Sequence, residues 1–278
     1  MAHGESPATS PRVEAPDATG DDASARVLVG DEGAVRVLTL SRPGRLNALD
    51  DRGRARLLAA VEEAMGHPGV RVLVLTGEGG DFSAGGDLTA MSTDPAVASG
   101  RLAVVTKLFR TLAAGPKPVI AAVEGRAYGL GLGLAAVSDH TVAARDAIFC
   151  CPFGRVGLVA DSGLHHTLPA RVGMGRAKRM LLFAEVVEGA TAAEWGLADR
   201  LCEPGEALAE ALRAARSLLS SAPLSQAESK RILADGTPDL DEALRMEGEA
   251  QARVVVTDDF AEGTRAFFGK RRPVFRGR

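Results

Sequence analysis

Two apolar runs that each end in a glycine-rich turn constrain the fold of this chain most strongly. The run Val70–Thr76 leads into TGEGGDFSAGGDL at residues 76–88, and the run Pro118–Val123 leads into GRAYGLGLGLA at residues 125–135. Nearly continuous apolar strands are typical of parallel sheets that helices cover on both faces. Because short β-rich runs alternate with longer helical patterns in this part of the chain, we predict an α/β fold.

Hydrophobic periodicity and turn residues predict the remaining elements. Further strands are expected at 27–29, 35–40 and 141–144. Helices are expected at 49–65, 102–113, 161–171, 174–183, 191–196, 205–220, 222–234, 239–252 and 258–268. These elements predict an α/β core over residues 26–204 and a helical region over residues 205–278. Residues 1–25 are rich in Pro, Ser, Ala, Gly and Asp, and this composition predicts a flexible N-terminal arm.

The glycine-rich turns do not match the common phosphate-binding motifs. Gly129, Gly131 and Gly133 form a G-x-G-x-G pattern, whereas a dinucleotide fingerprint has its third glycine one position later, and neither turn contains the P-loop motif. Two roles suit these glycines. They permit tight turns and close packing of helices, or they direct free backbone N–H groups into a cleft, where two converging N–H groups make an oxyanion hole.

Composition and cysteine spacing exclude several classes of protein. A net charge of −3 gives no overall field to attract nucleic acid or an anionic membrane, and we expect neither as a partner. Cys150 and Cys151 are neighbours and Cys202 stands alone, which is neither a zinc spacing nor a disulfide framework. We therefore expect three small buried residues and no metal. No secretory signal and no apolar run of about 18 residues is present, and a cytoplasmic location is expected.

Four sequence blocks point to one family. The chain contains the segments RPGRLNALD (42–50), FSAGGDL (82–88), KPVIAAVEGRAYGLGLGLAAVSD (117–139) and VGLVADSG (156–163). In this order and spacing they resemble the signature blocks of the crotonase family, the enoyl-CoA hydratase/isomerase superfamily. The resemblance implies a ClpP-like spiral of ββα units with a C-terminal helical trimerisation region. It also implies an acyl-CoA thioester substrate, no separate cofactor because coenzyme A is part of the substrate, and a homotrimer or a dimer of trimers.

The resemblance assigns site residues to the two glycine-rich turns and their surroundings. It places the oxyanion hole for the thioester carbonyl at the backbone N–H groups of Gly86 and Leu130. Contacts to the CoA thioester are implied for Arg45, Ala48, Ala84, Asp87, Leu88, Phe153 and Lys270, with Phe267 or Phe268 beside Lys270. Simpler roles also fit three of these residues: Asp87 suits a helix cap, Arg45 a solvated loop charge, and Lys270 a solvated tail.

The pattern of acidic residues favours one reaction type within the family. Hydration of an enoyl thioester generally uses two carboxylates, and in the hydratase pattern these align with Gly133 and Phe153, neither of which transfers protons. Family members with Asp at the position of Asp161 include enoyl-CoA isomerases, dienoyl-CoA isomerases and the isomerase of epoxidised phenylacetyl-CoA, which this block resembles most. We therefore predict an acyl-CoA isomerase in which Asp161 shuttles a proton while the oxyanion hole holds the enolate.

Several alternatives stay open. Asp161 lies before a predicted helix and equally suits a helix cap. The alternative functions are an enoyl-CoA hydratase, an aryl-CoA dehalogenase-type enzyme with Asp161 as nucleophile, and a non-catalytic CoA-binding or scaffold protein. His165 follows Asp161 by four residues and would share its face if the helix began at Asp161. His165 is therefore a candidate modulator of proton transfer, with simple polar packing as its alternative role.

Overall fold

The predicted apolar strands lie at the centre of a mixed sheet. The computed structural model describes residues 24–234 and 239–278, so that residues 1–23 of the expected N-terminal arm lie outside the described residues. Within the described part, the main sheet has the strand order β1–β2–β3–β4–β6–β9. These strands are β1 (Arg26–Glu32), β2 (Val35–Ser41), β3 (Val72–Gly77), β4 (Val119–Val123), β6 (His140–Ala144) and β9 (Arg200–Cys202). Strands β1 and β2 form an antiparallel hairpin, and the other neighbours are parallel.

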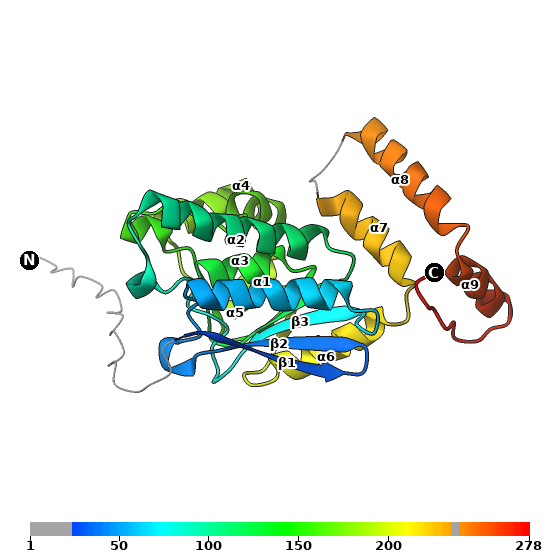
Figure 1. The fold of residues 1–278 in the computed structure, drawn as a ribbon, viewed down its shortest axis with the longest axis horizontal. Coiled ribbons are helices and arrows are strands. Elements are labelled where there is room, and N and C mark those ends of the chain that lie inside the picture. Colours follow the sequence, from blue (N-terminus) through cyan, green and yellow to red (C-terminus); the bar gives the residue numbers. More distant parts are fainter. Residues whose placement is uncertain (1–23, 235–238) are drawn as a thin grey trace, which may run out of the picture.

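The hydrophobic core surrounds β3 and β4. Every residue of β4 and all but the last residue of β3 are buried, which accounts for their nearly continuous apolar sequence. Helix α6 (Ala207–Leu218) packs against β3, β4 and β6. In Figure 1 the opposite side of the sheet is covered by α1 (Asp51–Gly66), α2 (Pro95–Ala114), α3 (Leu130–Val137) and α4 (Leu164–Phe183).

A second, smaller sheet positions the second glycine-rich turn. It consists of β5 (Arg126–Tyr128), β7 (Ile148–Cys150) and β8 (Val187–Glu188), and α5 (Gly189–Trp195) follows β8. Strand β5 ends directly before Gly129, and α3 begins at the next residue. These strands and β9 were not predicted from the sequence, because two or three residues are too few to show the alternation that identifies a strand.

Two helix boundaries differ from the sequence-based predictions. The helix expected at 102–113 is α2, which begins at Pro95, because Asp94 accepts a hydrogen bond from Ala96 N (2.7 Å) and proline suits the first helical position. The helices expected at 161–171 and 174–183 form one element, α4, which begins at Leu164 and has non-helical backbone at Gly173 (φ 78°). The predicted start at residue 161 was therefore wrong.

The C-terminal helices lie close to their expected positions. They are α7 (Pro223–Ala234), α8 (Leu240–Val254) and α9 (Asp258–Phe268). Figure 1 shows these three helices extending beyond the layered core at one end of the molecule. Among the residues that the structure describes, no helix is both long enough and apolar enough to cross a membrane.

The three cysteines are buried, as the sequence predicted. Cys150, Cys151 and Cys202 all have free thiols. Burial raises the pKa of Cys151 to about 12 and that of Cys202 to about 11. Since the thiolate is the nucleophilic form of cysteine, these side chains act as small packing groups.

Candidate active site

Backbone hydrogen bonds hold the two glycine-rich turns side by side. Ser83 N donates to Arg126 O (2.8 Å), and Tyr128 N donates to Ser83 O (2.9 Å). The buried hydroxyl of Ser83 also donates to Asn47 O (2.9 Å), which joins the first turn to the RPGRLNALD segment. Three of the four sequence blocks therefore meet at one place in the fold.

Glycine is required where the two turns come closest. Gly85 has φ 95°, and a Cβ built on it would lie 2.6 Å from Tyr128 O and 3.1 Å from Leu130 N. Gly129 has φ 54° and ψ −114°, a conformation that turns the chain from β5 into α3. A side chain at Gly85 or Gly129 would strain the backbone, because φ is positive at both positions. At Gly85 it would also clash directly with backbone atoms. The glycines thus permit a close approach of two backbones.

The N–H groups of Gly86 and Leu130 have no hydrogen-bond acceptor in the described part of the chain. Leu49 N donates to Gly85 O (2.8 Å) and Asp87 N donates to Leu49 O (3.0 Å), so both neighbours of Gly86 are fixed while its own N–H stays free. Leu130 is the first residue of α3, where helical N–H groups lack partners and the helix dipole is positive. Two such donors on adjacent segments can bind an oxyanion.

Asp161 lies in the loop between η3 (Phe153–Val156) and α4. Its Oδ1 accepts a hydrogen bond from Ser162 Oγ (2.7 Å), and Ser162 is buried with φ 58°. The N-cap of α4 is Gly163, and no side chain caps this helix. Asp161 is therefore not the helix cap that one interpretation of the sequence suggested.

The loop that carries Asp161 packs against Gly133 on α3. A Cβ at Gly133 would lie 2.6 Å from Ser162 Cβ and 3.1 Å from the Phe109 ring. The absence of a side chain lets Ser162 pack directly on the helix that begins at Leu130. Consequently, the space that a side chain at residue 133 would fill is occupied by Ser162 and Phe109, and no carboxylate fits there without their displacement.

We expect Gly133→Ala to lower the free energy of unfolding by about 1–3 kcal/mol, the usual cost of overpacking a core. The added methyl group must displace Ser162 or Phe109. Gly175→Ala is the matched control, because Gly175 lies on α4 with open space around its Cα. Urea unfolding midpoints measure the difference, and equal midpoints for the two variants would contradict this packing.

The histidines do not share a site with Asp161 in the expected way. Since α4 begins at Leu164, Asp161 lies outside the helix, and the predicted shared face of Asp161 and His165 was wrong. His165 and His166 are exposed. Within the described residues, no group of three or more His, Cys, Asp and Glu side chains is arranged to hold a metal ion.

The structure brings together most of the residues predicted to contact the CoA thioester. Ala84 N donates to Leu46 O (2.8 Å) and thereby joins the segment of Arg45 and Ala48 to that of Ala84, Asp87 and Leu88. Ala48 is buried, whereas Leu88 is exposed.

Asp87 has a structural role that the sequence had suggested. It caps η2 (Leu88–Ala90) by accepting from Thr89 N (2.9 Å), and it pairs with Arg42 Nη1 at 2.7 Å. Burial raises the pKa of this carboxyl, but the hydrogen bonds from Thr89 and Arg42 outweigh burial, so the net pKa lies below the ordinary value. Asp87 is thus a charged cap that fixes the turn after Gly86.

Phe153 and Lys270 lie in different surroundings. The Phe153 ring is 3.6 Å from a Cβ built at Gly129, so it borders the second turn. Lys270 is exposed and follows α9. Figure 1 shows α9 beyond the layered core, at the opposite end of the long axis from the blue segment that leads into α1. Within one chain, Lys270 therefore does not join the other predicted contacts.

Two buried polar side chains beside the turns were not singled out from the sequence. Asn47 is fully buried and donates to two backbone carbonyls of the first turn (2.7 and 2.8 Å). Arg54 is buried on α1, and a Cβ at Gly86 would lie 2.6 Å from its Nη2. Arg54 falls three positions before Leu57 on the buried face of α1. A charge on an apolar helical stripe is the signal that would have identified it.

Comparison with known proteins decides the family. The family model described as Enoyl-CoA hydratase/isomerase matches residues 30–278. The chain belongs to the enoyl-CoA hydratase/isomerase family. It is 34% identical over 253 residues to 1,2-epoxyphenylacetyl-CoA isomerase of Escherichia coli (strain K12), covering 89% of this chain and 97% of that protein. It is also 34% identical over 252 residues to crotonyl-CoA hydratase of Syntrophomonas wolfei, covering 90% of this chain and 97% of that protein.

The solved structures agree with this family. An enoyl-CoA hydratase from Polaromonas sp. JS666 superposes with a TM-score of 0.85 at 33% identity, covering 90% of this chain and 99% of that chain. The crotonase-type α/β fold predicted from the four sequence blocks is therefore confirmed, and the protein is an enzyme of the enoyl-CoA hydratase/isomerase family. An acyl-CoA thioester as substrate fits this family. Its members named above include both an isomerase and a hydratase.

Proposed function

We propose that this enzyme is an acyl-CoA isomerase, which shifts a double bond in an unsaturated acyl-CoA thioester with Asp161 as the proton shuttle. The observation that carries the proposal is the packing at Gly133. Ser162 and Phe109 fill the space where a hydratase-type carboxylate would stand, and the other hydratase position is Phe153. Asp161, whose neighbour Ser162 packs on α3, is then the candidate proton-transferring carboxylate. A single base suffices for isomerisation, whereas hydration generally needs an acid and a base.

The proposed reaction uses the two free N–H groups and Asp161 in sequence. The thioester oxygen accepts hydrogen bonds from the N–H groups of Gly86 and Leu130. Asp161 then removes a proton from the acyl chain, and the electron pair left behind is delocalised onto the thioester oxygen as a dienolate. The N–H groups stabilise this oxyanion. Protonated Asp161 returns the proton to a different carbon, which completes the shift without any net loss of atoms.

Predicted contacts to the CoA part come from the surface around the first turn. Arg45 and Leu88 lie on the segments joined there, and the ion pair of Arg42 and buried Asp87 holds these segments in place. Phe153 borders the second turn. We infer that the thioester lies between the turns, with CoA toward Arg45 and the acyl chain toward Phe109.

Two substrates supplied separately test the proposed reaction. Isomerisation of a 3-enoyl-CoA creates the conjugated thioester chromophore, whereas hydration of a 2-enoyl-CoA bleaches it. We expect absorbance to rise with 3-enoyl-CoA and to stay nearly constant when a 2-enoyl-CoA is supplied. Rapid bleaching with 2-enoyl-CoA and no rise with 3-enoyl-CoA would show a hydratase and contradict the proposal.

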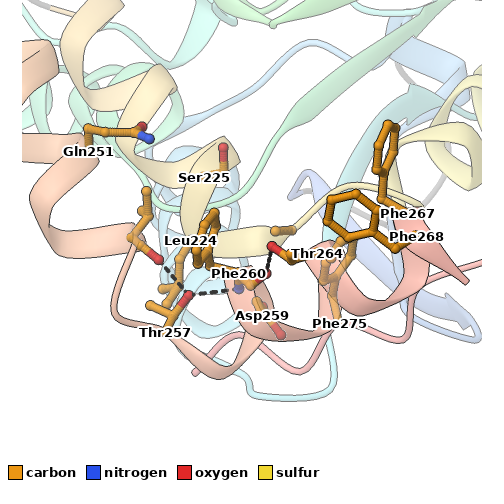
Figure 2. Close-up of a pocket in the computed structure, with 13 residues that line it drawn as sticks. Leu224, Ser225, Gln251, Thr257, Asp259, Phe260, Thr264, Phe267, Phe268 and Phe275 are labelled. Atoms are coloured by element: carbon orange, nitrogen blue, oxygen red, sulfur yellow. Dashed lines mark hydrogen bonds between the residues drawn. The ribbon is translucent and has the colours of Figure 1, made fainter.

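We also propose that the protein assembles as a homotrimer, or as a dimer of trimers, through its C-terminal helices. Figure 2 shows a groove between α7, α8 and α9 into which several aromatic side chains project. The groove has a volume of about 530 Å³. Phe267 and Phe268 border it with 78% of each residue exposed, and apolar surface of this kind marks interaction sites.

Sedimentation velocity tests the proposed oligomeric state. Wild-type enzyme is expected to sediment as a trimer or hexamer, and the double variant Phe267→Ser, Phe268→Ser as a smaller species, because the change removes apolar area from the interface. Val29→Ser is the control, since Val29 is exposed on β1, outside the groove. A monomeric wild-type enzyme at micromolar concentration would contradict the assembly.

A further inference from the structure

A buried guanidinium lies directly against the proposed oxyanion turn. The Arg54 side chain is 3% exposed, and its Nη1 donates to Asp51 Oδ1 (2.6 Å). Its Nη2 and Cζ lie 2.6 and 3.8 Å from a Cβ built at Gly86. No other acceptor for this guanidinium is present in the described residues. A charged group with five N–H donors is therefore held beside Gly86 with a single hydrogen bond, to Asp51, among the described residues.

A second arginine completes a cationic cluster. Arg101 lies on α2, which packs against α1, and its Nη1 is buried with no hydrogen-bond partner in the described part of the chain. Burial lowers the pKa of Arg54; Asp51 raises it, Arg101 lowers it further and Asp161 raises it. Asp51, Arg101 and Asp161 thus each act electrostatically on Arg54, and the helices α1 and α2 that carry the two arginines pack against each other.

The carboxylates present do not satisfy the two arginines. Asp51 is 46% exposed and bonds Arg54 from the adjacent turn of α1. The Asp161 carboxylate accepts from Ser162 and takes up a proton during the proposed reaction, which removes its negative charge. Leaving a buried charged donor such as Arg101 Nη1 without an acceptor is costly. The arrangement therefore lacks an anion.

We propose that Arg54 and Arg101 form an anion-binding subsite for a carboxylate carried by the acyl group of the substrate. The inference rests on the proposed function, because it takes Gly86 as the oxyanion donor and Asp161 as the proton shuttle. Guanidinium groups match carboxylates in shape and charge. The CoA phosphates are a poorer match, because the predicted CoA contacts lie around Arg45 and the exposed Leu88, whereas Arg54 is buried beside Gly86.

Binding of saturated thioesters tests the subsite independently of catalysis. Dicarboxylyl-CoA thioesters of four to six carbons are titrated against their ω-methyl esters by calorimetry. Wild-type enzyme is expected to bind the best-fitting free acid about 10- to 100-fold more tightly than its ester, the range for hydrogen bonds to charged groups. Arg101→Met is expected to bring this affinity ratio close to one. Arg54→Lys keeps the charge but loses the two parallel N–H donors of the guanidinium, and we expect it to reduce the ratio partly.

Matched variants separate a subsite from a general effect of charge. Arg52→Met and Arg110→Met remove exposed charges from α1 and α2, and both are expected to keep the wild-type ratio. Equal wild-type affinity for acid and ester at every chain length would overturn the proposal. So would a loss of affinity in Arg101→Met that is equal for both thioesters, which would indicate a structural role.

These experiments distinguish failure of the anion-binding subsite from failure of the proposed isomerase function. Saturated thioesters have no double bond to move, so a preference for the acid persists even if the 3-enoyl-CoA assay shows no isomerisation. Conversely, isomerisation of neutral 3-enoyl-CoA without any preference for the acid would leave the proposed function standing and remove only the subsite.

Discussion

Asp161→Asn enzyme is expected to isomerise a 3-enoyl-CoA with kcat about 10²- to 10⁴-fold below wild type, the usual contribution of a general acid–base group. Asparagine preserves the size of the side chain and can still accept the hydrogen bond from Ser162 Oγ, but it neither takes up nor returns a proton. KM should change little, because the oxyanion donors and CoA contacts are intact. Appearance of the conjugated thioester absorbance measures the rate.

Asp146→Asn is the control for this variant, because Asp146 is an exposed carboxylate in the turn between β6 and β7. It should retain the wild-type rate. An unchanged rate in Asp161→Asn would mean that another group moves the proton and would remove Asp161 from the mechanism. A wild-type enzyme inactive toward both 2-enoyl- and 3-enoyl-CoA would instead favour the non-catalytic or dehalogenase-type alternatives.

Gly85→Ala is expected to lower kcat/KM by about 10²- to 10³-fold, the effect of losing one oxyanion-hole donor. The new methyl group would lie 2.6 Å from Tyr128 O at a backbone φ of 95°, so the first turn must move away from the second. That movement separates the N–H groups of Gly86 and Leu130. Steady-state kinetics on protein whose circular dichroism matches wild type measures the loss.

Gly30→Ala is the control for the glycine variant, since Gly30 has open space around its Cα and no positive φ. It should leave kcat/KM unchanged. Wild-type kcat/KM in Gly85→Ala would show that the close approach of the two turns is not needed for catalysis, and the oxyanion assignment would then fail.

The sequence predicted those parts of the fold that rest on long patterns. Strands β3 and β4 and helices α7 and α9 lie close to their expected positions, because each has a clear apolar run, a helical period or a cap. Strands of two or three residues, such as β8, carry no usable period. The start of α4 was misplaced because Asp161 resembles a cap in sequence, whereas Gly163 takes that position.

The candidate site was predictable where it depends on backbone, and less so where it depends on packing. The two glycine-rich turns and Asp161 follow from sequence blocks. Arg54 was overlooked because the helical period draws attention to the apolar residues of α1, and its contact with Gly86 depends on how α1 lies against the first turn. The role proposed for Arg101 likewise depends on the packing of α2 against α1, which the sequence does not show.

The packing of Ser162 on Gly133 limits how the reaction of this enzyme could change during evolution. A single change to glutamate at residue 133 would meet Ser162 and Phe109 before it could meet a substrate, so the variant would lose stability before gaining a new reaction. Any mutational path that places a carboxylate at residue 133 must first shrink residue 109 or reshape the loop at residues 161–163. The volume available at residue 133 thus sets the order of steps along such a path, and laboratory evolution that begins at Phe109 should accept glutamate at residue 133 sooner than evolution that begins at Gly133.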